Sequence, residues 1–164
     1  MISHHSFQIT TSARPEFFDV TERAKEALKA SGLVNGTVLV YSQHTTCSVF
    51  VQEESEDTTY YGMQFILQDT LNAFAKIAAP VRHEGQYLHP GPIHIANATS
   101  LRNEKREWGL NTDGHIISSI LGRSETIPVV DKQLILGEFG RIYFADLDSV
   151  RERTRIVRIT ITGE

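Results

Sequence analysis

The sequence has few of the features that mark secreted, membrane-spanning or nucleic-acid-binding proteins. It holds one cysteine, Cys47, so no internal disulfide can form and a reducing compartment is permitted. No apolar run approaches the ~20 residues that span a bilayer, and no charged-then-apolar leader opens the chain. The 16 basic and 20 acidic residues give a net charge of -4, so there is no excess of basic residues to bind the phosphate backbone of a nucleic acid. We therefore expect a cytoplasmic protein that binds neither nucleic acid nor a membrane.

The composition is that of an ordinary folded domain. Of the 164 residues, 40% are hydrophobic and 22% are charged, which excludes a disordered chain, a collagen and a low-complexity scaffold. A chain of this length can bury roughly 70% of the surface that its unfolded form exposes, so it needs no metal or disulfide merely to fold. No repeat or linker divides it. We predict a single domain over residues 1–164.

Apolar periodicity predicts the order of helices and strands. In the last strand, Val157, Ile159 and Ile161 alternate with polar residues, as in a half-buried strand. The same kind of pattern predicts strands at residues 7–11, 37–41, 47–53, 127–130, 134–136, 142–147 and 155–162. Helical spacing predicts a helix from about Asp19 to Gly32 and two more at residues 57–78 and 114–121. Residues 80–112 are predicted to form a long loop. This order lacks strict βαβ alternation, so we expect an α+β fold with a mainly antiparallel sheet.

Histidines are the most informative candidates for chemistry. Five of the seven, His44, His83, His89, His94 and His115, fall in or beside predicted loops. Neutral imidazole is the commonest metal ligand. Three of these histidines would suit a catalytic zinc-type site in which one coordination position stays open. No HxxxH or CxxC pair is present, however. Spacing alone therefore favours scattered surface or hydrogen-bonded histidines over a metal site.

His44 is the strongest single candidate, because it lies in a polar run between two predicted strands. Thr46 would share its face of an unbroken strand, whereas Cys47 would point the opposite way and suits a small buried thiol. Glu53 ends the second of these strands and could act as a general base or hold a ligand. The alternative interpretation, without a functional role, is a polar strand end followed by acidic residues that favour a helix start.

Arginines recur at alternate positions just before and within the last predicted strand. Arg151, Arg153 and Arg155 would share one face and could meet an anionic group. Such a row is more often merely solvated. His89 lies in a segment stiffened by two prolines, which suits either ligand positioning or a structural turn.

Taken in order along the chain, several short motifs resemble those of the YjbQ family, also called the secondary thiamine-phosphate synthase family. Residues 43–53 (QHTTCSVFVQE) resemble its HTT…E segment. Residues 87–89 (YLH) look like its Tyr-x-His, and residues 114–122 (GHIISSILG) look like its His-x-x-Ser-x-x-Gly. Matches at residues 127–129, 136–137 and 153–155 complete a resemblance over nearly the whole chain.

The resemblance implies a fold, an assembly and a site. It implies one YjbQ-like domain, with a mixed, mainly antiparallel sheet curled into a half-barrel and helices packed on one side, assembled as a homotrimer. It implies convergence of His44, His89 and His115 on one site that can hold a divalent metal, zinc or magnesium. The suggested activity is a weak synthesis of thiamine phosphate from a pyrimidine pyrophosphate and a thiazole phosphate.

From these observations we expect a small enzyme that acts on a phosphorylated substrate. The expected catalytic residues are His44, Glu53 and His115. Substrate would be bound by Thr45, Thr46, Arg153 and Arg155. A metal-dependent hydrolase, with Glu53 activating water, and a non-enzymatic trimeric binding protein remain the alternatives.

One departure from the family concerns the segment between the second and third predicted site histidines. The spacing from His89 to His115 is longer here than in a typical member, which an insertion at residues 93–110 would explain. We expect residues 96–110 to lie beside the histidine site, with Trp108 over a ligand or at a subunit boundary. His94 is then the alternative to His89 as the loop ligand, and His83 should be dispensable.

Overall fold

The C-terminal strand β8 (Arg153–Gly163) organises the larger of two sheets in the computed structural model, which describes residues 1–164. It pairs on one side with β1 (Ile2–Thr11) and on the other with β3 (Gly36–Ser42). The sheet continues through β5 (Ser124–Val130) to β6 (Gln133–Leu134). As predicted, Val157, Ile159 and Ile161 are buried, because every second side chain of β8 faces the core.

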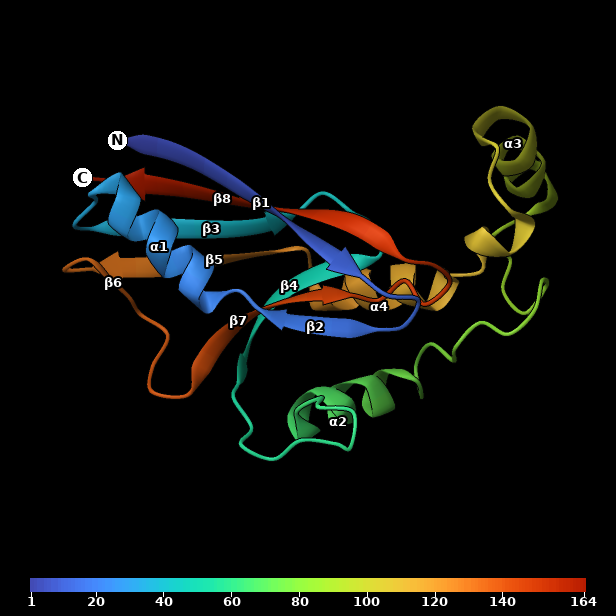
Figure 1. Cartoon of the computed structure of the whole chain (residues 1–164), viewed down its shortest axis with the longest axis horizontal. Coiled ribbons are helices and arrows are strands. Elements are labelled where there is room, and N and C mark those ends of the chain that lie inside the picture. Colours follow the sequence, from blue (N-terminus) through green and yellow to red (C-terminus); the bar gives the residue numbers. More distant parts are fainter.

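A second, three-stranded sheet curls against the first. Its strand order is β2 (Glu16–Asp19), β7 (Gly140–Asp146), β4 (Cys47–Glu53). The pairings between these strands, like those in the larger sheet, are antiparallel. Together the two sheets form a half-barrel, and the N- and C-termini of the chain lie close together at one end of it (Figure 1). The predicted α+β class and half-barrel are confirmed.

Alternation along β4 and β7 buries both faces of the smaller sheet. Val49 and Phe144 point into the main core between the sheets. Phe50 and Tyr143 point the other way, into a second core. The two outer helices, α2 (Phe65–Phe74) and α4 (Thr112–Leu121), supply residues to that second core. The small sheet is therefore held from both sides, which fixes the loops at its ends.

Helix α1 (Thr21–Ser31) runs across the strands of the larger sheet and packs its apolar stripe into the main core (Figure 1). The Asp19 carboxylate accepts the backbone N–H of Thr21 at 2.9 Å, which stabilises the start of the helix. Gly32 ends it with φ of 72°, a left-handed conformation that glycine adopts readily. Both predicted ends of this helix are therefore close to the observed ones.

Two predictions about the middle of the chain are wrong. The helix expected at residues 57–78 is confined to α2, because Thr58 and Gln64 form a β-bridge around Gly62, whose φ is 83°. The expected loop at residues 80–112 instead contains α3 (Pro92–Arg102) and a 3₁₀ turn, η1 (Arg106–Gly109).

The helix α3 gave little periodic signal because only Ile95 and Ala98 on it are buried. Pro92 occupies its first turn, where proline is tolerated, and Asn103 ends it in a left-handed conformation. In Figure 1, α3 stands off from the two sheets on a projecting segment, residues 80–111, which we call the arm. No helix in the chain is long and apolar enough to cross a membrane.

Candidate functional site

A polar cavity of about 690 Å³ lies where the arm returns to the half-barrel. Its histidines come from three separate parts of the chain: His44 from the turn between β3 and β4, His89 and His94 from the arm, and His115 from α4. Trp108 is the one hydrophobic residue of the lining. The fold thus brings together side chains that no local spacing makes neighbours.

His115 is oriented by a backbone contact. Its Nδ1 lies 3.1 Å from the carbonyl oxygen of Thr45. Because a carbonyl only accepts, Nδ1 carries the proton and donates it, which leaves Nε2 as a free acceptor. Burial lowers the pKa of His115, although the Thr45 carbonyl and the Asp148 carboxylate act in the opposite direction. The ring is therefore neutral near pH 7 and can accept a proton.

Two more imidazoles lie beside this one. The ring centroid of His89 is 5.6 Å from that of His115 and 4.8 Å from that of His94. Neither the His89 ring nor the His94 ring makes a hydrogen bond within the protein. Burial lowers the pKa of His89, and the neighbouring histidines lower it further, since two adjacent cationic rings would repel. These rings are thus available to a ligand.

His44 lines the same cavity, but its Nε2 is already engaged. This nitrogen accepts the backbone N–H of Ile156 on β8 at 2.9 Å. An accepting Nε2 requires the proton on Nδ1, so the ring is neutral and Nε2 is not free for a metal or a substrate. Burial lowers the pKa of His44, and the charge of Arg155 lowers it further. His44 connects the polar turn to the central sheet.

The predicted metal ligands do not form a metal centre as they are placed. No three histidine, cysteine, aspartate or glutamate side chains are arranged so that one metal ion could bind them all. For His44 the reason is its hydrogen bond to β8. Of the predicted set, His89 and His115 are neighbours, and His94 is the third ring beside them.

A buried ionic network lies beneath the cavity. Arg155 donates to both carboxylate oxygens of Asp146, at 2.8 and 2.9 Å, and to the hydroxyl of Thr46 at 3.0 Å. The side chains of Arg155 and Asp146 are 6% and 0% exposed. The Thr11 hydroxyl donates to the same aspartate at 2.7 Å. Arg155 is thus held by the protein, and it supports the floor of the cavity through Thr46.

Asp148 links this network to the arm. Its Oδ2 accepts from Arg153 at 3.1 Å and from the Asn111 amide at 3.3 Å. Arg153 is half-buried, with its guanidinium partly free of Asp148, so it is the predicted arginine best placed to meet a ligand. Thr45 is exposed at the rim, where its carbonyl orients His115.

Glu53 is not brought to the histidines. It lies at the far end of β4 from the polar turn, where it pairs with Gly140 and is exposed. The strand has seven residues, so about 20 Å separates its ends. The expectation that this carboxylate lies beside the site histidines is not met. His83 is exposed and does not line the cavity.

The segment at residues 96–110 borders the cavity, as expected from the insertion. Arg102, Glu104 and Trp108 all line it. The Arg151 guanidinium lies 4.0 Å from the Trp108 ring centroid and donates to Glu104 at 2.8 Å. Sequence reasoning missed the roles of Glu104 and Asp148, for which charge alternation gave no signal.

Protonation of His44 should destabilise the fold. Because its pKa in the folded protein is lowered from the ordinary 6.5, the free energy of unfolding should fall as the pH drops below about 6.5. His44→Gln offers an acceptor that does not titrate, so its stability should depend less on pH. Urea unfolding at pH 7.5 and pH 5.0 measures both. An equal pH dependence in His44→Gln and the unaltered protein would contradict the role, and exposed His83→Gln is the matched control.

Comparison with known proteins places these features in context. The family model described as "UPF0047 protein YjbQ-like" matches residues 5–164. A UPF0047 protein of Methanothermobacter thermautotrophicus is 29% identical over 95% of this chain and 89% of its own length. YugU of Bacillus subtilis is 27% identical over 94% of this chain and 96% of its own. The crystal structure of a hypothetical protein from Aeropyrum pernix has a TM-score of 0.74 and 30% identity, covering 99% of both chains.

Proposed function

We propose that this chain, which belongs to the YjbQ-like family of UPF0047 proteins, is an enzyme that acts on a small phosphorylated substrate in the histidine cavity. One observation carries the proposal. Three imidazoles with free nitrogens, those of His89, His94 and His115, gather in a polar cavity beside Arg102 and Arg153. Guanidinium groups suit phosphate oxygens, and an imidazole with a free nitrogen suits proton transfer.

The proposed reaction joins a hydroxymethylpyrimidine pyrophosphate to a thiazole phosphate. The bond between the pyrimidine methylene carbon and the pyrophosphate oxygen breaks, and its electron pair leaves with pyrophosphate. The lone pair of the thiazole nitrogen forms the new carbon–nitrogen bond. Catalysis then consists of positioning two anionic substrates and stabilising the charge on the leaving pyrophosphate.

Each cavity residue has a stated part in this reaction. Arg153 binds a phosphate oxygen with the part of its guanidinium that Asp148 leaves free. His115, whose Nε2 is unprotonated at neutral pH, accepts a hydrogen bond from a protonated phosphate oxygen of the bound substrate and takes up that proton, while the coupling itself releases none. His44, Arg155 and Thr46 hold the floor beneath them rather than touch the substrate.

A bound divalent metal stays a prediction. The donors in the cavity are imidazole nitrogens, because both of its carboxylates, Glu104 and Asp148, are paired with arginines. Nitrogen donors suit zinc, whereas magnesium prefers oxygen. Of the two metals expected from the sequence, zinc is therefore the one that this donor set favours.

Product analysis tests the proposal. The protein is incubated with both phosphorylated substrates, and pyrophosphate release is measured together with the coupled product. Release that requires both substrates supports the transferase. Release of phosphate or a hydrolysed ester from one substrate alone would indicate the hydrolase. Saturable binding without turnover would indicate a non-enzymatic binding protein. The hydrolase has lost its predicted base, since Glu53 lies outside the cavity.

The predicted homotrimer has support in the exposed apolar residues of the arm. Leu88 is 100% exposed, Ile93 78% and Leu101 75%. Apolar side chains that gather on one projecting segment are typical of a protein–protein interface. We propose that the arm packs against a neighbouring copy, with a buried interface well above about 1,000 Å².

Charge in the arm should therefore disrupt the assembly. The double variant Leu88→Glu/Leu101→Glu should convert a trimer into a monomer, because a buried carboxylate without a partner is strongly unfavourable. Light scattering at micromolar concentration measures the mass. Val130→Glu, which alters a half-exposed apolar residue on β5, is the matched control and should remain a trimer. A monomeric mass for the unaltered protein would refute the assembly.

A further inference from the structure

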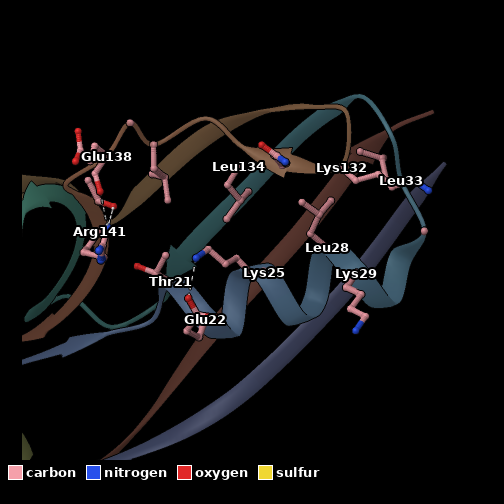
Figure 2. Close-up of a pocket in the computed structure, with 15 residues that line it drawn as sticks. Thr21, Glu22, Lys25, Leu28, Lys29, Leu33, Lys132, Leu134, Glu138 and Arg141 are labelled. Atoms are coloured by element: carbon pink, nitrogen blue, oxygen red, sulfur yellow. Dashed lines mark hydrogen bonds and ion pairs between the residues drawn. The ribbon is translucent and has the colours of Figure 1, made fainter.

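A second cavity lies at the opposite end of the half-barrel, between α1 and the chain that arches over it from Lys132 to Arg141 (Figure 2). Its volume is about 860 Å³, within the range of small-molecule sites. It shares no lining residue with the histidine cavity. Nothing in the proposed reaction uses it.

Leucines form the apolar part of this cavity. Leu28 on α1 and Leu33 just beyond it are buried and line one side, and half-buried Leu134 and Leu136 line the arch. Figure 2 shows Leu28 and Leu134 approaching each other across the space between the helix and the arch. Asp131 and Lys132 have φ of 50° and 64°, which gives the tight turn that starts the arch. Leu28 and Leu33 pack behind Leu134 and Leu136, so the half-buried pair offers the apolar surface that a ligand body would contact.

The charged residues of the lining are mostly positive. Its ionisable side chains are two acidic groups, Glu22 and Glu138, and four basic groups, Lys25, Lys29, Lys132 and Arg141. The chain as a whole has a net charge of -4, so this excess of cations is local. Local positive charge over a low-dielectric apolar floor raises the concentration of anions there.

Two of the four cations have no partner in the protein. Lys25 pairs with Glu22 at 2.8 Å, and Arg141 pairs with Glu54 at 2.6 Å. Lys29 and Lys132 take part in no ion pair. They come from the helix and from the arch at the Leu33 end of the cavity, and Figure 2 draws the Lys29 side chain pointing away from the arch. Because the lysine stem is flexible, a change of rotamer turns the Lys29 ammonium toward an anionic group held by Lys132.

We propose that this cavity binds a small amphipathic anion, an apolar chain or ring that carries one carboxylate or phosphate. The apolar body lies against Leu134 and Leu136, and the anionic group lies between Lys29 and Lys132. The polar end of the cavity, with Thr21 and Arg141, accommodates any further hydrogen-bonding group. The site is a binding site, separate from the chemistry of the histidine cavity.

Ligands that differ only in head group test the proposal on the unaltered protein. Decanoate, decyl phosphate, decanol and decyltrimethylammonium are titrated, and backbone amide shifts locate each one. Both anions should bind at residues 25–33 and 132–141, with decanol weaker by about tenfold and the cation weaker still. Decyl phosphate binding much more tightly than decanoate would identify a phosphate site. Equal binding of decanol, no binding of either anion, or shifts confined to the histidine cavity would overturn the proposal.

Substitutions distinguish the effect of the two lysine charges on binding from any effect on the fold. Lys29→Gln/Lys132→Gln should weaken decanoate about tenfold and leave decanol unchanged. Lys76→Gln, which alters an exposed lysine after α2, is the matched control and should change neither. Gln133→Trp, which alters an exposed lining residue, should block both ligands by filling the cavity. Undiminished decanoate binding in the double-lysine variant would contradict the proposed head-group site. Turnover in the histidine cavity should be the same in all of these variants.

Discussion

Replacing His115 by alanine should lower substrate turnover at least about a hundredfold, the usual contribution of a positioned acid–base group. The ring is held by the Thr45 carbonyl with its Nε2 free, and its lowered pKa keeps it neutral near pH 7. Alanine removes both the proton acceptor and a wall of the cavity. Steady-state turnover with both phosphorylated substrates at pH 7.5 measures the effect.

A matched pair of controls isolates the chemistry of this residue. His83→Ala removes an exposed histidine outside the cavity and should keep full turnover. His115→Gln should keep the fold but remain as inactive as His115→Ala, since an amide does not exchange a proton at this pH. Turnover within about threefold of the unaltered protein in His115→Ala would remove His115 from the mechanism.

Replacing Asp146 by alanine should destabilise the protein by about 3–5 kcal/mol, because it leaves the buried Arg155 guanidinium without its main partner. The arginine then keeps only Thr46 and a contact of 3.5 Å with Asp148. The Thr11 hydroxyl also loses its acceptor. Equilibrium unfolding in urea measures the loss.

An exposed ion pair provides the contrast for this prediction. Glu22→Ala breaks the pair with Lys25, whose side chains are 78% and 54% exposed, and should change stability by less than about 1 kcal/mol. Similar losses for Asp146→Ala and Glu22→Ala would contradict the structural role of the buried network. Arg155 would then be free to bind substrate, as the sequence alone suggested.

The strands and their faces could be predicted from the sequence because their signal is local. Val157, Ile159 and Ile161 alternate with polar residues, and burial follows that alternation. The arm could not be predicted in the same way, since α3 buries too few residues to produce a helical stripe. For α2 the predicted start at residue 57 was too early, because the chain turns at Gly62 before the helix begins at Phe65.

In the candidate site, too, the residues could be identified from the sequence, whereas their roles depend on the assembled fold. Resemblance to a family singled out His44, His89 and His115, and these line one cavity. The role of each ring depends on contacts between distant segments, such as the hydrogen bond that the backbone N–H of Ile156 donates to Nε2 of His44. Alternating Arg153 and Arg155 look alike in sequence, but one faces the cavity and the other is buried against Asp146. Such differences arise only when the strands are assembled.

Binding of inorganic pyrophosphate to the protein tests the central claim most directly. It is titrated at pH 7.5 while backbone amide shifts are followed, with no metal and no second substrate present. We predict saturable shifts at residues 44–46, 89–94 and 111–115 and at Arg153, and their loss in His115→Ala but not in His83→Ala. An absence of saturable shifts at these residues, or shifts found only elsewhere in the chain, would contradict a phosphate site in the histidine cavity.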